Sequence, residues 1–223
     1  MPRRDSVDKV VEGYFAAVTS RPFVWKGETI APPPVLRVPP TILRGFTCPS
    51  GCGGCCPTFT LDYLPEPAEL HPYPLTPRTI ELDGRDVVVW SDTQADNRGP
   101  RCRNLDPGDG RCGIHGRQPF SCDFELLGVQ RGQHSWTLTT RLFSRGWNMH
   151  RTDGGVGNLC ELIPATPEWR DDVSRRLRRL DLWARHFGLT TCLPHVLDWI
   201  EAVGDDVIAG REVPDLRLRA SRR

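Results

Sequence analysis

Apolar residues recur at helical spacing near both ends of the chain. Ser6 is a suitable N-cap, and apolar positions follow it at i, i+3 and i+4, which predicts an amphipathic helix over residues 7–19. Thr166 is a suitable N-cap for a longer pattern over residues 167–187, which stops before a glycine. A third pattern covers residues 194–204. The sequence therefore predicts one helix at the start and two near the end.

Apolar and polar residues alternate in the middle of the chain, as they do in strands. Asp83-Gly84 separates residues 79–82 from residues 85–90, and this dipeptide is typical of a two-residue β-hairpin turn. A second hairpin is predicted within residues 123–143, and a short strand is predicted at residues 59–64. These elements predict a scaffold rich in hairpins.

Two segments lack either period. Residues 21–47 contain a Pro-Pro-Pro and a Pro-Pro, which favour extended backbone, so we expect a covering loop or linker there. We expect this segment to pack on the body of the protein through Phe23, Trp25, Ile42 and Phe46. Residues 217–223 form a basic tail that we expect to be frayed.

Four cysteines lie within nine residues among glycines and prolines. Glycine reaches positive φ without steric cost and proline fixes φ, so this loop can fold back until its sulfurs converge. Cysteines that only fill a core are expected singly on periodic elements, and this stretch has no period. The spacing C-x3-C-x2-C-C therefore favours a metal site. Its members are Cys48, Cys52, Cys55 and Cys56.

A second set of cysteines follows at equal spacings in another irregular segment, which contains Pro107-Gly108-Asp109-Gly110. Neither set offers the two spaced C-x2-C knuckles of a zinc ribbon. We therefore expect the two loops to converge on one site. The second set is Cys102, Cys112 and Cys122, and Cys160 is a candidate eighth ligand.

Thiolates select zinc, copper(I) or iron–sulfur clusters over magnesium or calcium. Seven clustered cysteines exceed the four that one zinc ion or one [4Fe-4S] cluster needs. The sequence therefore predicts a cofactor that is an iron–sulfur cluster or a polynuclear iron or zinc site, with zinc as the alternative to iron. Two other functions stay open, an iron-dependent redox or modifying enzyme and a zinc-stabilised interaction module. No catalytic residue stands out.

The spacing of Cys48, Cys52 and Cys55 also occurs in radical S-adenosylmethionine enzymes. Those enzymes need a run of βα units behind the motif, whereas this chain shows hairpins and proline loops. Adjacent cysteines such as Cys55 and Cys56 are awkward ligands for one ion, so they are expected to serve neighbouring metals or to leave one thiol free.

The cysteine pattern resembles the YkgJ-like cysteine-cluster family, a zinc- or iron-chelating domain with a C-x2/3-C-x2-C-C signature. The first cysteine set matches that signature. Cys112-Gly113-Ile114-His115, followed by Arg117, Pro119 and Cys122, resembles the family's second segment, and Cys102 takes the place of its upstream cysteine. Gln118 separates Arg117 from Pro119, which departs from the family pattern. The resemblance covers roughly residues 45–125, and a related cysteine domain occurs in flagellin lysine methylases.

Other candidate residues are assigned simpler roles. His115, three residues after Cys112, is a candidate ligand, but we expect it to hydrogen-bond a ligand thiolate or to be an ordinary loop residue. Cys192 lies next to a predicted helix start and is expected to be a small buried apolar residue. His134 and His150 are expected to be surface or loop residues.

The charge balance disfavours nucleic acid as a partner. The formal net charge is +1, and the arginines of the long predicted helix share its turns with Asp171, Asp172 and Asp181, which predicts paired, solvated charges. No apolar run is long enough to span a membrane, and no apolar stretch of a signal peptide follows Met1, so we expect a cytoplasmic protein. In a reducing compartment, nine cysteines are better explained by metal or redox chemistry than by disulfides. Metal ions are the expected partners, and any electron-transfer or protein partner is left unspecified.

The expected fold class is α+β, with a small hairpin-rich cysteine-loop metal-binding core and flanking N-terminal and C-terminal helices. Three regions follow from this reading. Residues 1–44 form an N-terminal helix and proline-rich covering segment, residues 45–162 a cysteine-cluster metal-binding domain, and residues 163–223 a C-terminal helical region with a basic tail.

Overall fold

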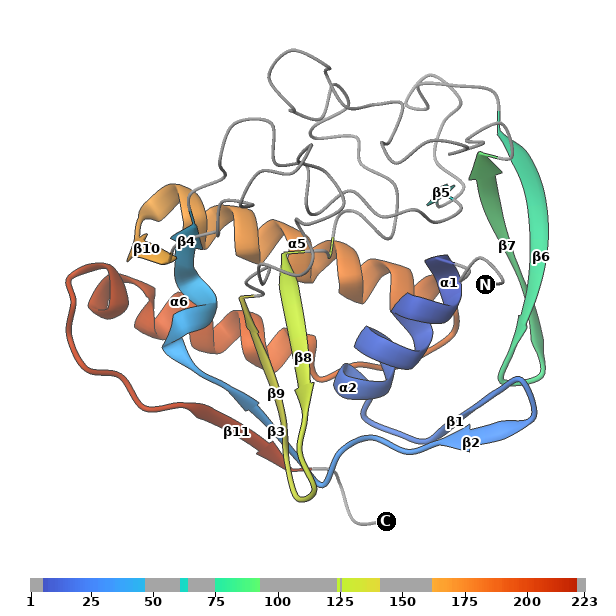
Figure 1. Ribbon diagram of the computed structural model, residues 1–223, viewed down its shortest axis with the longest axis horizontal. Coiled ribbons are helices and arrows are strands. Elements are labelled where there is room, and N and C mark those ends of the chain that lie inside the picture. The colour runs from blue at the N-terminus through green and yellow to red at the C-terminus, as the bar shows by residue number, and fades with distance from the viewer. Residues whose placement is uncertain are drawn as a thin grey trace, which may run out of the picture.

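Helices and several small sheets make up the part of the chain that the computed structural model describes (Figure 1). The described residues are 6–46, 61–63, 75–92, 124, 126–140 and 162–219. Within these ranges the protein is α+β, as predicted. No helix in the same ranges is both long and apolar enough to cross a membrane.

The first helical segment is confirmed, but its middle is wound differently from a regular α-helix. It consists of α1 (Ser6–Lys9), a π-helical stretch η1 (Val10–Phe15) and α2 (Ala16–Val18). A π-helical turn contains an extra residue per turn, so apolar side chains spread over more of the surface than in a regular helix. This segment is buried on most sides, through Val7, Val10, Val11, Tyr14, Phe15, Ala16, Ala17 and Val18.

The prediction of a loop over residues 21–47 is wrong, because this segment forms several short strands. They are β1 (Phe23–Trp25), β2 (Glu28–Ile30), β3 (Val35–Val38) and β4 (Arg44–Phe46), with a 3₁₀ turn η2 (Pro40–Leu43). The prolines lie between the strands, and Lys26 and Gly27 adopt positive φ in the tight turn between β1 and β2. The predicted anchoring is confirmed for Phe23, Trp25 and Ile42, which are buried, while Phe46 is partly buried.

A four-stranded sheet joins distant parts of the chain in the order β11–β3–β9–β8. Strands β8 (Leu127–Arg131) and β9 (Trp136–Thr140) confirm the second predicted hairpin. The prediction of a frayed tail is wrong for residues 217–219, because β11 (Leu216–Arg219) pairs with β3. Arg37 holds this pairing with an ion pair of 2.5 Å to Asp215.

A three-stranded sheet in the order β5–β7–β6 contains the first predicted hairpin. Strand β6 (Thr76–Leu82) and strand β7 (Arg85–Asp92) flank Asp83 and Gly84, whose φ values of 54° and 70° fit the tight turn that the sequence predicts. The short strand predicted at residues 59–64 is present as β5 (Leu61–Tyr63).

Two long helices follow near the end of the chain. Helix α5 (Pro167–His186) begins where predicted, and the Trp169 N–H donates to the Thr166 Oγ1 atom of the N-cap at 3.4 Å. Helix α6 (Leu193–Ile208) runs four residues beyond Gly204, where the sequence predicts its end. Gly204 lies within α6 because Arg170 of α5 packs against it, and a Cβ atom there would lie 2.7 Å from the Arg170 Cδ atom.

One hydrophobic core receives side chains from all of these elements except β4 and β5. Phe15 of the first helical segment meets Phe187 at the end of α5, with ring centroids 5.4 Å apart. Sheet β11–β3–β9–β8 takes strands from each of the three regions that the sequence suggests. The boundaries of those regions stay a prediction.

A short ladder connects the early strand β4 to β10 (Leu162–Ala165), directly before α5. Gly45 of β4 lies under the indole ring of Trp169, which also contacts the ring of Phe46 at a centroid distance of 5.2 Å. A Cβ atom at position 45 would overlap that indole ring. Only glycine therefore allows Trp169 to pack on the β4 backbone.

Gly45→Ala should lower the free energy of unfolding by about 3 kcal/mol, because the added methyl group must displace a packed indole. Gly13→Ala is the matched control, since nothing lies within 4 Å of a Cβ atom built at Gly13. Denaturant unfolding followed by circular dichroism measures both variants. Equal stability of the two variants would contradict the proposed packing.

Candidate functional site

The predicted ligands lie in the parts of the chain that the structure leaves undescribed. These residues are Cys48, Cys52, Cys55, Cys56, Cys102, Cys112, Cys122 and Cys160, and the candidate ligand or ligand partner His115 lies there too, as does the expected surface residue His150. Their roles stay predictions. The described strands next to them nevertheless fix where several of these segments begin and end.

Strands β4 and β10 bring the start of the first cysteine segment next to the end of the last undescribed segment. Phe46, the final residue of β4, is the register partner of Leu162, the first residue of β10. Cys48 follows Phe46 by two residues and Cys160 precedes Leu162 by two residues. Two residues span at most about 7 Å, so each cysteine Cα atom lies within about that distance of its neighbouring strand end.

Two further places where the described chain adjoins the cysteine segments lie on the same side of the molecule. Leu61 at the start of β5 is the register partner of Asp92 at the end of β7, so the chain leaves this sheet for the second cysteine set beside the point where it returns from the first. Phe124, two residues after Cys122, is fully buried. In Figure 1 the ends of β4 and β7 and the start of β8 all face the upper side of the molecule.

Tyr14 fixes the position of Phe124. The Tyr14 hydroxyl lies 2.6 Å from the carbonyl oxygens of both Phe124 and Leu127, and it donates to this pair. The rings of Tyr14 and Phe124 also pack with centroids 5.9 Å apart. The first helical segment therefore holds the chain directly after the last cysteine of the second set.

A buried polar cluster joins β5 and β7, which adjoin the cysteine segments, to their neighbour β6. Asp62 of β5 is completely buried, and Ser91 of β7 donates a hydrogen bond from its Oγ atom to the Asp62 carboxylate. Arg78 of β6 donates from Nη2 to both Asp62 oxygens at 3.1 Å and from Nε to Ser91 Oγ at 3.1 Å. All three side chains lie on the inner face of the sheet, because Asp62 pairs with Ser91, and Arg78 pairs with Val89, two residues away on the same face.

This cluster is the polar feature that sequence reasoning misses. A carboxylate buried in a protein is tolerated only when it is paired and hydrogen-bonded, and Arg78 and Ser91 supply both here. The available signal was Asp62 between Leu61 and Tyr63, an acid inside a short apolar strand. Its partners come from strands that only the fold brings together.

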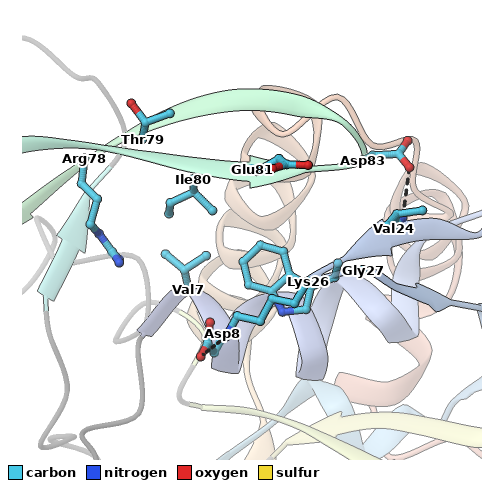
Figure 2. Close-up of a pocket in the computed structure, with 11 residues that line it drawn as sticks. Val7, Asp8, Val24, Lys26, Gly27, Arg78, Thr79, Ile80, Glu81 and Asp83 are labelled. Carbon is cyan, nitrogen blue, oxygen red and sulfur yellow. Dashed lines mark hydrogen bonds and ion pairs between the residues drawn. The ribbon is translucent and has the colours of Figure 1, made fainter.

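A pocket of about 440 Å³ lies beside this cluster, between α1, the β1–β2 turn and β6 (Figure 2). Val7 and Ile80 form apolar walls, and Arg78 lies at one end. Lys26 crosses the pocket to form an ion pair of 2.6 Å with Asp8, and its ammonium group also lies 5.3 Å from the centroid of the Trp25 ring.

Cys192 has the structural role that the sequence predicts. It precedes α6, is partly buried, and packs against the core, and its N–H donates to the Val18 carbonyl at 2.8 Å. Burial raises the pKa of the Cys192 thiol to about 11, with a further contribution from the charge of Asp181. A thiol in this state is protonated at neutral pH and is a poor metal ligand.

The described histidines and acids do not form a metal site. Among residues 6–46, 61–63, 75–92, 124, 126–140 and 162–219, no group of three or more histidine, cysteine, aspartate or glutamate side chains is arranged to hold a metal ion. His134 is exposed in the β8–β9 turn, as predicted. The His186 Nε2 atom lies 2.9 Å from the Val88 carbonyl oxygen, where it connects α5 to β7.

Three arginines of α5 are paired within the helix, as the sequence predicts, but Arg176 and Asp181 are buried and not solvated. Asp172 binds Arg175 and Arg176 at 2.7 Å each, and Asp181 binds Arg185. Burial raises the pKa of Asp172, but the hydrogen bonds and charges of Arg176 and Arg175 outweigh this effect, so its pKa lies below the ordinary value. These pairs leave α5 with less free positive charge for phosphate binding than its composition suggests.

Comparison of the chain with protein-family models, with curated proteins and with solved structures gives no match. The function of the protein is therefore inferred from its own residues.

Arg78→Leu should lower the free energy of unfolding by about 3 kcal/mol, because it leaves the carboxylate of Asp62 buried without its cation. Lys26→Leu is the matched control, since it breaks an ion pair whose lysine side chain is 56% exposed, and such a pair contributes about 0–1 kcal/mol. Urea unfolding of both variants makes the comparison. A loss for Arg78→Leu no larger than for Lys26→Leu would show that Asp62 has access to water or to another partner.

Proposed function

We propose that this protein binds metal through cysteines of two loops, as an iron–sulfur cluster or as a polynuclear iron or zinc site. The single observation that carries the proposal is the pairing of Phe46 with Leu162. It connects the segment that contains Cys48 to the segment that contains Cys160 through adjacent strands. Thiolates that bind one cofactor must meet, and chain segments separated by more than a hundred positions do so only when the fold joins them.

The register of β4 and β10 gives this connection a specific form. Cys48 is the second residue after Phe46, and Cys160 is the second residue before Leu162, so the two cysteines are equally spaced from one pair of register partners. This symmetry supports Cys160 as a ligand beside the seven cysteines of the two sets.

The ladder between β5 and β7 supports the participation of the second set. Leu61, five residues after Cys56, is the register partner of Asp92, ten residues before Cys102, so the strands nearest in sequence to the two cysteine sets share one sheet. Asp62, Ser91 and Arg78 hold those strands together. Because both loops are attached to one rigid sheet, they would lose less conformational entropy when their cysteines bind a metal.

The test is the metal content of protein purified without oxygen. Cys48→Ser, Cys52→Ser and Cys160→Ser should each lose most of the bound iron or zinc, because each removes a thiolate ligand. Cys192→Ser is the matched control and should keep its metal, since Cys192 belongs to the core. Full retention of metal in the first three variants would overturn the proposal.

The same samples separate the possible cofactors. Iron with an equal amount of acid-labile sulfide and a visible absorption band that dithionite bleaches would indicate a redox-active cluster, and would favour an electron-transfer or modifying role. Zinc without colour would indicate a closed site in an interaction module.

A further inference from the structure

Strand β6 has one edge without a partner among the described strands. It is the terminal strand of the sheet β5–β7–β6, and β7 occupies its other edge. Leu82 and Arg85 flank the two-residue turn and are therefore a hydrogen-bonded pair. Because such pairs alternate with pairs whose backbone groups point outward, Thr79 and Glu81 direct their N–H and C=O groups away from β7.

Two observations agree with this assignment. The Asp83 N–H, two positions after Glu81, donates to the Val24 carbonyl of β1 at 2.8 Å, so the outward direction leads toward β1. Pro77, two positions before Thr79, has no N–H, and proline is accepted in a strand where that group would point outward. The outward backbone N–H and C=O groups of Thr79 and Glu81 form no hydrogen bond with another described residue.

The pocket of Figure 2 lies along this edge. Four consecutive residues of β6, from position 78 to position 81, line it, although their side chains alternate between the two faces of the sheet. A pocket that contacts consecutive strand residues must border the edge of the strand. Across it lie Val7 of α1 and the turn residues Lys26 and Gly27, and Figure 2 shows the side chains of Val7 and Ile80 directed toward one another.

The charges along the edge favour a basic ligand. Lys26 is paired with Asp8, and Arg78 is paired with Asp62, so the two cations of the pocket are already neutralised. Glu81 and Asp83 are exposed, and neither forms an ion pair with another described residue. The remaining charge beside the outward backbone groups is therefore negative.

We propose that the free edge of β6 binds an extended peptide segment of a partner protein by strand addition. The backbone of the peptide pairs with Thr79 and Glu81, an apolar side chain enters between Val7 and Ile80, and a lysine or arginine lies beside Glu81 and Asp83. A second copy of this chain fits less well. The bonds between Asp83 and Val24 hold β1 against the end of β6, which hinders two β6 edges from meeting side by side.

The probe is a short, fluorescently labelled synthetic peptide in which valine and lysine alternate, measured by fluorescence anisotropy with the full chain purified without oxygen. Thr79→Pro should weaken binding about fivefold or more, because it removes one outward donor while the hydrogen bonds to β7 remain. Glu81→Lys should weaken binding by a similar factor, because it reverses the charge. Glu201→Lys is the matched control on the exposed surface of α6 and should bind as the unmodified chain does.

Metal content and circular dichroism of each variant keep this test separate from the proposed metal site, because neither β6 substitution should change them. Saturable binding that both β6 variants weaken supports the proposal. Equal binding by the unmodified chain and both β6 variants, or no saturable binding, overturns it. Concentration-dependent dimers that Glu81→Lys abolishes would assign the edge to a second copy and would also overturn it. Binding that occurs only after removal of residues 1–5 would assign the edge to the chain's own start, with the same consequence.

Discussion

The burial of the first helical segment, Ser6–Val18, is the constraint on which the rest of the structure depends. Its apolar side chains are almost completely removed from solvent, so the neighbouring elements must supply surfaces that cover them. Tyr14 holds the chain before β8, Phe15 meets the end of α5, and the Val18 carbonyl accepts the N–H of Cys192. This segment therefore connects β8 to the end of α5 and to the residue before α6.

One cluster of polar residues lies within the sheet β5–β7–β6. Asp62, Ser91 and Arg78 lie on its three strands, and two of these strands, β5 and β7, are the ones that adjoin the undescribed cysteine segments. Apolar contacts tolerate small slips along a surface, whereas charge-assisted hydrogen bonds to a buried carboxylate specify both distance and orientation. The cluster therefore gives this sheet a fixed geometry where apolar packing alone would leave freedom.

Local patterns in the sequence predicted the helices and hairpins that have strong hydrophobic periodicity. The helices at 7–19 and 167–187 and both hairpins are present, because their caps, turns and periodicity are properties of neighbouring residues. The strands β1 to β4 were missed because each has only three or four residues between prolines and is stabilised by partners far away in the sequence. The same reason explains β11, whose basic residues look solvated until β3 is placed beside them. The cysteines, in contrast, predict a metal site by residue type and spacing, and their geometry lies outside the described residues.

The pairing of β3 with β11 has a consequence for how the protein is made. Arg37 and its ion-pair partner Asp215 are 178 positions apart, so this edge of β3 is covered only after a much later part of the chain has been made. Contacts between distant positions form slowly, and a strand that emerges first and pairs last is exposed to other chains in the meantime. During synthesis on the ribosome, chaperones would therefore have to keep that edge of β3 from pairing with a neighbouring chain. The prolines and turns on either side of β3 would help, because they keep the strand short.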